Sequence, residues 1–410
     1  MVNILWLTMF FSSIILAVCN AIFYQDLSIF NDIINAIFDN AENAVKISIG
    51  LVGILSFWLG ILKIIEDSGL TNKISNKLTP LFKIIMKDIP ENSPAISSIV
   101  LNMSANFLGL DNAATPIGIK AMEQLQEHNK NKSEASDAQI LFMILNASSI
   151  TLIPITIFMY RAQLGAIRPT EVFIPILLAT SVSTIVGFLL VAIKQKIDLR
   201  NKILIKWIGS LLGIILTISV SFALIKQEHR LLLSSAIGNI LLVIIISIVF
   251  IIAIKNKVKC YESFVIGARD GFNVAITILP YLIAMLVAIG IFRASNVLDL
   301  ITHSIKYLCL AINIDTAFVD ALPAAFMKPL SGSGARAMMI EIMQTHGVES
   351  FASFCASVIQ GSTETTFYVL SVYFGAINIY KTRYALKYAL ISDLAGICAA
   401  ILFSYLFYTY

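Results

Sequence analysis

The sequence predicts an all-α integral membrane protein with about nine transmembrane helices and two re-entrant hairpins. Its composition supports this fold class, because 58% of the 410 residues are hydrophobic and 13% are charged, whereas ordinary soluble domains carry about 25% charged residues. Two apolar segments at matching places in the two halves of the chain, 104–120 and 328–337, are interrupted by Gly, Pro and small polar residues. Paired interruptions of this kind are typical of the binding site of a secondary transporter.

Apolar runs of roughly 20 residues, the length that crosses ~30 Å of hydrocarbon, predict the transmembrane helices. They lie near 2–24, 44–66, 138–160, 171–193, 203–225, 231–254, 271–292, 351–377 and 386–408. The two interrupted regions, 95–123 and 318–345, have apolar arms too short to span the bilayer singly, so we expect hairpins that return to their own side. A segment of mixed polarity precedes each hairpin, at 72–87 and 297–314, and suits a helix in the interface plane.

The distribution of positive charge predicts the orientation. Nineteen Lys and Arg residues fall in one set of loops and adjoining helix ends, whereas the opposite loops carry six: Arg161, Arg168, Lys226, Arg230, Arg293 and Lys306. Because cytoplasmic loops are enriched in Lys and Arg, we expect the N-terminus in the cytoplasm and the C-terminus outside. The loop with Asp26, Asp32, Asp39 and Glu42 contains no Lys or Arg and is expected outside.

The order of elements predicts an inverted repeat. A span, an interfacial segment, a hairpin and two further spans occur at 44–193 and again at 271–408, in opposite orientations. Weak local matches follow the same order, such as 146–151 against 360–365. The predicted parts are therefore an N-terminal helix with an acidic external loop (1–43), a first repeat (44–193), a two-helix linker (194–270) and a second repeat (271–410).

The hairpin tips are the predicted solute site, because unpaired backbone groups at membrane depth must line a cavity or be buried in protein. A helix expected to begin at Pro116 follows the first tip, and another follows Ser331 to Gly334; such helix starts favour anionic or strongly polar groups. The predicted substrate-binding residues are Asn106, Asp111, Asn112, Thr115, Asn146, Ser149, Ser331, Gly332, Ser333, Gly334, Gln360, Ser362 and Thr363.

Residues 360–366 are polar on every helical face, which predicts local unwinding near the midplane. Glu364, together with Asp111, is the predicted ion-coupling residue, because a carboxylate within the membrane indicates function by default. Structural alternatives stay open: Glu364 pairs with Lys328 or Arg336, and Asp111 caps a helix. The polar residues of 146–151 have a similar alternative as hydrogen-bonding contacts between helices.

The sequence gives no positive indication of catalysis. It contains no evident nucleophile–base pair or metal-ligand cluster, so neither an enzyme nor a metal site is predicted. No cofactor is expected, and the choice of coupling ion between Na⁺ and H⁺ stays open. The net charge of +4 follows the topology and suggests no nucleic acid partner. The five cysteines are scattered and are expected to be buried free thiols: Cys19, Cys260, Cys309, Cys355 and Cys398.

The same segments resemble a known family. Residues 106–126, with Leu-Gly-Leu-Asp-Asn-Ala-Ala-Thr-Pro, are similar to spore maturation protein A, and 328–335 and 360–375 are similar to spore maturation protein B. The chain resembles a fusion of the two over nearly its whole length. The resemblance implies a nucleoside-recognition (Gate) domain and the inverted hairpin plan of concentrative nucleoside transporters. Neither hairpin shows the acidic pattern expected of nucleoside contacts, which leaves the substrate open.

Together these features predict a multi-pass protein of the bacterial inner membrane. Its predicted function is secondary transport of a small polar or anionic solute, nucleoside-like molecules included, by alternating access between the two repeats. The alternative is a membrane assembly or sensor protein of the spore-maturation type that keeps the fold without turnover. A transporter is expected to contain a polar midplane cavity bounded by both hairpins, and a scaffold a closed interface. The expected partners are the lipid bilayer and the solute, and homo-oligomerisation stays open.

Overall fold

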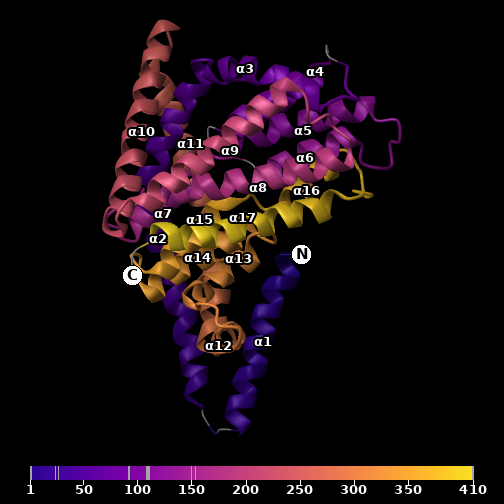
Figure 1. The fold of residues 1–410 in the computed structure, drawn as a ribbon. Helices are drawn as coiled ribbons and strands as arrows, with labels where there is room; N and C mark the ends of the chain where they lie inside the picture. The colour runs from indigo at the N-terminus through magenta and orange to yellow at the C-terminus, as the bar shows by residue number, and fades with distance from the viewer. Residues whose placement is uncertain are drawn as a thin grey trace.

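The computed structural model describes residues 2–23, 25, 27–90, 93–107, 111–148, 150–152 and 154–408. Helices are the regular elements of this part of the chain (Figure 1). They are α1 (Val2–Phe23), α2 (Ser28–Asp67), α3 (Leu70–Ile85), α4 (Pro94–Phe107), α5 (Asp111–His128), α6 (Asp137–Ala147), α7 (Ile155–Gln163), α8 (Phe173–Lys194), α9 (Lys202–Leu224), α10 (Gln227–Lys255), α11 (Cys260–Ala294), α12 (Val297–Ala311), the 3-10 helix η1 (Ala317–Ala321), α13 (Leu322–Met327), α14 (Gly332–His346), α15 (Phe351–Ser362), α16 (Thr366–Ala376) and α17 (Ala385–Phe407).

Within the described residues, seven helices are long and apolar enough to cross a membrane: α1, α2, α8, α9, α10, α11 and α17. The two other predicted spans, 138–160 and 351–377, are each divided into two shorter helices. The unwinding predicted at 360–366 is confirmed, because α15 ends at Ser362 and α16 begins at Thr366. The interruption between α6 and α7 contains Pro154, which has no N–H to continue a helical ladder.

Three expectations are corrected by the structure. The acidic segment before residue 44 is helical, because α2 already begins at Ser28, and Asp32 and Asp39 lie on its exposed side. The helix expected to begin at Pro116 begins at Asp111, so this proline lies inside α5. All five cysteines are free, but only Cys355 is buried; Cys19, Cys260 and Cys309 are partly exposed, and Cys398 is exposed.

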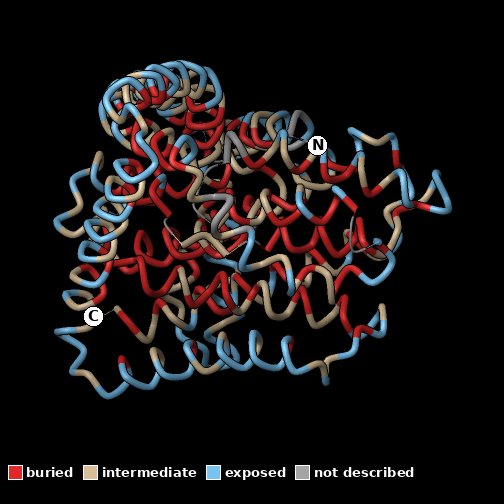
Figure 2. Tube along the Cα trace, turned by 90° about the horizontal axis from the view of Figure 1, so that it is seen from above, coloured by how far each residue is buried: buried red, intermediate tan, exposed pale blue. Residues whose placement is uncertain are grey.

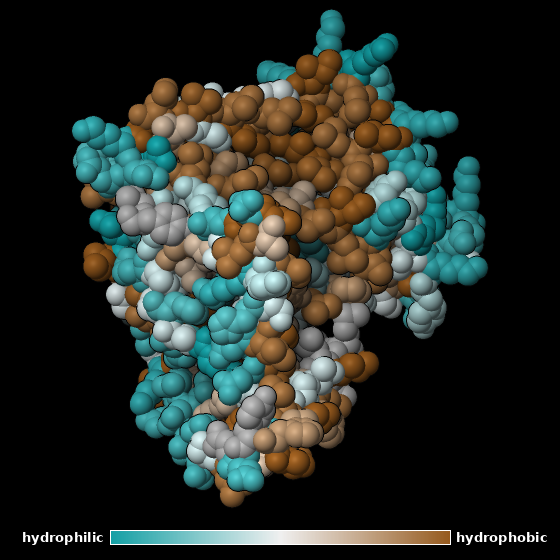
Figure 3. Space-filling model, turned by 60° about the horizontal axis from the view of Figure 1, so that its bottom comes forward, coloured by the Kyte–Doolittle hydropathy of each residue, from teal (hydrophilic) through white to brown (hydrophobic). Residues whose placement is uncertain are grey.

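The surface suits a lipid environment. Only 11% of the apolar window of α9 and 17% of that of α10 is buried inside the protein, so their outer faces have no protein contact. Figure 2 shows buried residues gathered in the middle and exposed ones along the outer helices. The exposed residues of α9 and α10 include many Ile, Leu and Val, and a broad hydrophobic surface is visible in Figure 3. Membrane lipid can cover this surface without the cost of exposing it to water.

The same order of elements occurs in both halves. α2 to α8 correspond in order to α11 to α17, with a short pair of helices in each half, α4 with α5 and α13 with α14. Matching bends follow the first helix of each half, because Gly69 and Asn296 both adopt left-handed backbone conformations, with φ of 69° and 63°. The buried Ser68 and Ser295, each directly before the bend, donate to carbonyls of the preceding turn.

Corresponding long helices of the two halves pack antiparallel along small residues. Gly267 lies against Leu59 and Lys63 of α2, and Gly290 lies against Asn40, so α2 and α11 run in opposite directions. Helix α1 also packs on α11, where Trp6 Nε1 donates to the carbonyl of Ala284 at 2.9 Å. Small residues at such contacts allow close backbone approach in a membrane protein.

The contact between α8 and α17 is reciprocal. Ser183 Oγ donates to the carbonyl of Ser392 at 3.0 Å, and Ser392 Oγ donates to the carbonyl of Ser183 at 2.7 Å. A Cβ at Gly187 would meet Ser392, and one at Gly396 would meet Ser183. Each helix therefore contributes the same Ser-x-x-x-Gly pattern to a locally twofold interface, the small-residue spacing of close helix pairs.

Gly271→Ala is expected to destabilise the protein, because a Cβ there would lie 2.5 Å from Ser56 Cα and 2.6 Å from its N. Backbone atoms cannot move aside without separating α2 from α11, and overpacking of this kind costs about 1–3 kcal/mol. Gly213→Ala on α9 is the matched control, since its Cβ would meet nothing within 4 Å and should gain up to about 1 kcal/mol from helix propensity. Thermal unfolding in detergent measures both; equal melting temperatures would contradict this packing.

Loops predicted on the same side of the membrane contact one another. At one end, Arg383 Nη1 lies 2.8 Å from Asp137 Oδ1, and Gln195 Nε2 donates to the hydroxyl of Tyr384 at 2.9 Å. At the other end, Arg230 Nη1 donates to the carbonyl of Leu406 at 2.6 Å, and the N–H of Ile167 donates to Glu349 at 2.8 Å. The two ends correspond to the predicted cytoplasmic and external loops, respectively.

Candidate functional site

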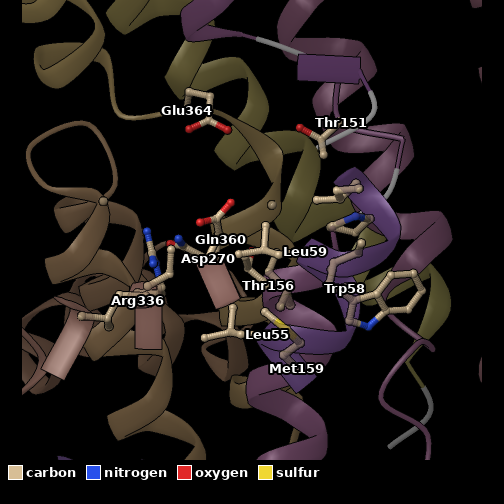
Figure 4. A pocket seen from close by; sticks show the side chains of 18 of the residues that line it. Leu55, Trp58, Leu59, Thr151, Thr156, Met159, Asp270, Arg336, Gln360 and Glu364 are labelled. Carbon is tan, nitrogen blue, oxygen red and sulfur yellow. The ribbon is translucent and has the colours of Figure 1, made fainter. Parts of the chain in front are cut away.

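A cavity of about 600 Å³ lies where the two interrupted helices meet α2, α11 and the α13–α14 pair (Figure 4). Its size is in the range of small-molecule sites, roughly 300–1,000 Å³. The polar or charged lining residues are Lys63, Glu66, Thr151, Thr156, Asp270, Asn273, Thr277, Lys328, Arg336, Gln360, Thr363, Glu364 and Thr365. Apolar side chains complete the wall, among them Leu55, Trp58 and Met159.

The interruptions are held open by backbone hydrogen bonds to neighbouring elements. The N–H of Glu364 donates to the carbonyl of Ala147 at 2.8 Å, so the second interruption bonds the last residue of α6. The N–H of Leu152 donates to Phe107, the last residue of α4, at 3.0 Å, and that of Phe367 donates to Pro329 at 3.1 Å. Backbone groups left unpaired by unwinding therefore find partners, as they must inside a membrane.

The turn between α13 and α14 contributes one of its four predicted residues to the cavity. Gly332 lines it, and a Cβ at this position would lie 2.7 Å from Thr365 Oγ1. Ser331 instead caps α14, accepting from the N–H of Gly334 at 3.1 Å. Gly334 is buried against the methyl of Met327, where a Cβ would come within 2.2 Å. Bulk at residue 334 would therefore disturb packing behind the cavity wall.

Four further predicted residues lie around the second interruption. Gln360, Thr363 and Glu364 line the cavity, whereas Ser362 is buried and donates to the carbonyl of Ile359 at 2.8 Å. Glu364 is partly exposed and forms no salt bridge within the described part of the chain. Figure 4 shows its carboxylate level with Thr151, whereas Arg336 lies below it in the view, nearer Gln360 and Asp270.

Asn106 and Asn146 belong to a different cluster. Asn106 Nδ2 donates to Asn146 Oδ1 at 2.8 Å, and the hydroxyl of Tyr373 donates to the same oxygen at 3.0 Å. Asn102 Nδ2 donates to the carbonyl of Ala114 at 2.7 Å. This network ties α4 and α5 to α6 and α16, which is the interhelical role considered for 146–151.

The first hairpin contributes no described residue to the cavity lining. Thr115 is described and lies outside the lining, and the side chains of Asp111 and Asn112, together with Ser149, lie outside the described residues. Of the residues predicted as ion-pair partners, Lys328 and Arg336 both line the cavity, and Lys328 is buried.

Several lining residues were not predicted as part of a site. Asp270, Asn273 and Thr277 of α11 are exposed and share one helical face, so they form a polar stripe along the cavity. Their spacing of three and four residues was visible in the sequence, at the start of the predicted span 271–292 and in the residue directly before it. Lys63 and Glu66 of α2, 3.0 Å apart, lie near the bend at Gly69.

A buried ion pair lies outside the cavity lining. Arg161 Nη2 is 2.5 Å from Glu171 Oε1, and their side chains are 0% and 2% exposed. Arg161 Nη1 also donates to Ser357 Oγ at 3.4 Å. The pair connects the end of α7 to α15 and to the start of α8, where the sequence suggested an external loop.

Comparison with known proteins places this architecture in a family. Residues 48–163, which include the first interruption and much of the α2 wall, match the family described as nucleoside recognition (Gate). Spore maturation protein A of Bacillus subtilis (strain 168) is 43% identical over 185 residues, 45% of this chain and 91% of that protein. The chain belongs to the spore maturation protein A and B family.

Spore maturation protein B of the same organism is 44% identical over 159 residues, 39% of this chain and 88% of that protein. The chain thus covers most of both relatives, as the fusion inferred from the sequence requires. No solved structure shows a significant match to the chain. The family therefore supports a membrane protein of the spore-maturation type with a Gate domain.

Proposed function

We propose that this protein is a secondary transporter of a small polar solute, working by alternating access between two inverted repeats in the bacterial inner membrane. The observation that carries the proposal is the polar cavity at two helix interruptions within an otherwise apolar helical protein. Discontinuous helices around a central site are the usual construction of such carriers, and irregular backbone is tolerated at membrane depth where it lines a cavity.

The packing between halves supports the inverted repeat. Corresponding helices, α2 with α11 and α8 with α17, run antiparallel, and the Ser183–Ser392 contact is reciprocal. Two copies of one unit related by an axis in the membrane plane would produce this arrangement. In this reading α4–α5 and α13–α14 are the re-entrant hairpins, and rocking of one repeat against the other moves the solute.

The lining favours a neutral or zwitterionic solute. Three basic residues, Lys63, Lys328 and Arg336, and three acidic ones, Glu66, Asp270 and Glu364, contribute no net charge. Trp58 adds an aromatic face, which can stack on a planar ring. A nucleoside combines a planar base with a hydroxyl-rich sugar, so we take nucleosides as the first solutes to test, in keeping with the Gate description of residues 48–163.

The cavity is proposed to open toward the cytoplasm. Lys63 and Glu66 lie near the end of α2, where Asn256 Nδ2 donates to the carbonyl of Ser68 at 2.6 Å. Ser68 and Asn256 both lie next to loops of the group that is rich in Lys and Arg. The positive-inside rule assigns this group of loops to the cytoplasm. The N-terminus is then cytoplasmic and the C-terminus external.

Thr277→Cys, in a chain whose five native cysteines are replaced, is expected to react with a membrane-impermeant maleimide from the cytoplasmic side only. Thr277 lines the cavity, whereas the neighbouring Ile276 is 54% exposed on a face outside the lining. Ile276→Cys should be unreactive from both sides, because lipid covers it. Inside-out and right-side-out vesicles make the comparison; labelling of Thr277→Cys from outside only, or equal labelling of both variants, would contradict the proposed cavity.

Solute specificity is tested by adding single nucleosides to the Thr277→Cys vesicles and to proteoliposomes of the unmodified chain. Protection from labelling together with uptake driven by a Na⁺ or pH gradient supports the transporter. The names of the relatives favour one second candidate, a spore-maturation assembly protein without turnover. Labelling without protection or uptake by any nucleoside or zwitterionic amino acid would favour that candidate.

A further inference from the structure

A buried carboxylate outside the predicted site lies behind the second interruption. Asp393 of α17 is 1% exposed, and neither of its carboxylate oxygens has a hydrogen-bond partner. Thr363 and Thr366 are its polar neighbours, but neither hydroxyl makes a well-formed hydrogen bond with it. The position is supported by packing, since the Thr363 methyl lies against Gly396, one turn further along α17.

Three more buried oxygens in this region lack partners. They are Thr363 Oγ1, Thr366 Oγ1 and, one helical turn before Thr363, Gln360 Oε1. Their residues are 3%, 0% and 9% exposed. Buried polar atoms are nearly always satisfied in proteins. The unpartnered hydroxyls of Thr363 and Thr366 beside the unpartnered Asp393 carboxylate therefore indicate a missing ligand.

The other half of the protein provides an internal comparison. The reciprocal Ser183–Ser392 contact sets Thr184 of α8 in the position that matches Asp393 of α17. Thr184 Oγ1 donates to the carbonyl of Ser148 at the first interruption, and to that of Thr180 at 3.0 Å. The Thr184 hydroxyl is therefore hydrogen-bonded within the protein. The Asp393 carboxylate, at the equivalent position in the other half, has no proton to donate to such a carbonyl.

Charge at this site is also unbalanced. Among the described residues, Lys328 and Glu364 exert the largest charge effects on Asp393, so this group of three contains two carboxylates and one lysine. One negative charge in this group is left without a counter-charge. Inside a membrane it must be neutralised by a bound cation or by protonation.

We propose that Asp393, with the Thr363 and Thr366 hydroxyls, binds one sodium ion at the second interruption. The ligands are all hard oxygen atoms, which suit an alkali cation rather than a soft metal. One net negative charge fits a monovalent ion. Thr363 also lines the cavity, so the ion would lie directly behind the solute wall. Ion binding does not require transport; coupling of the ion to solute movement rests on the proposed function.

Binding of ²²Na⁺ to purified protein in detergent tests the proposal, with choline keeping ionic strength constant. We expect saturable binding of one ion per chain, and a melting temperature that rises with NaCl but not with choline chloride, because an ion that binds only the folded state stabilises it. Asp393→Asn should abolish binding while melting no lower than the unmodified protein without Na⁺, since it removes an uncompensated buried charge.

Thr366→Val is a second test of the site, which is needed if Asp393→Asn does not fold. It should weaken Na⁺ binding at least roughly tenfold, because it removes one ligand. Thr184→Val, at the matching place in the other half, should bind Na⁺ with unchanged affinity. Absence of saturable binding, or binding retained in Asp393→Asn, would overturn the site. A melting temperature that responds to pH and not to Na⁺ would also overturn it and assign a proton to Asp393.

Discussion

Glu364→Gln is expected to give a folded protein whose gradient-driven solute uptake falls to the level of protein-free vesicles. Gln keeps the size of the side chain and most of its hydrogen bonding but removes the charge at the interruption between α15 and α16. A carboxylate that changes its interactions during a transport cycle cannot be replaced by a neutral amide, whereas a merely space-filling one can. Uptake into proteoliposomes and the melting temperature in detergent are measured together.

Glu66→Gln is the matched control for this experiment. Glu66 lines the same cavity but is 54% exposed beside Lys63 at its outer end, so we expect uptake to persist. A Glu364→Gln protein that melts early, and is restored by Lys328→Met or Arg336→Met, would identify Glu364 as a structural ion-pair member. That result would not decide whether Asp393 binds Na⁺, which the ²²Na⁺ binding experiment tests separately.

Arg161→Leu is expected to lower the free energy of unfolding by about 3–5 kcal/mol, the cost of leaving a buried charge without its partner. Glu171 is 2% exposed and could not recover water as a substitute. Arg168→Leu is the control, because this arginine lies 3.6 Å from the same carboxylate but is 41% exposed. It should cost less than about 1 kcal/mol.

The double variant Arg161→Leu with Glu171→Met should recover most of that loss, because an apolar replacement of a whole buried pair is often neutral. Denaturant titration in detergent measures all four proteins. A double variant as unstable as Arg161→Leu alone would show that the apolar replacements pack badly and that the cost is not mainly one of unpaired charge.

The sequence was most informative about long apolar elements and about one interruption. Seven continuous spans were predicted because helices of about 20 apolar residues have few alternatives. The break at Ser362–Thr366 was predicted because five polar residues in a row leave no apolar face. The acidic start of α2 was missed, because exposed Asp32 and Asp39 on a helix have the same composition as a loop.

The candidate site was harder to predict, because it depends on contacts between distant segments. Gln360, Thr363 and Glu364 were named from polarity alone, and the structure brings them beside Asp270, which is 90 residues or more away in sequence. Asp393 was missed although it lies in the predicted span 386–408, where the rule applied to Glu364 would have singled it out; what sequence could not show is its neighbours. Nor could sequence distinguish Asn106 and Asn146, which bond to each other, from polar residues that face the cavity.

The antiparallel contacts of α2 with α11 and α8 with α17 join one half of the chain to the other. These surfaces, rather than the α9–α10 linker, hold the halves together. The two relatives resembling these halves are separate proteins, whereas this chain combines both in one polypeptide. The covalent connection fixes their stoichiometry at one to one and raises their effective concentration, so pairing requires no encounter between two independently inserted membrane proteins.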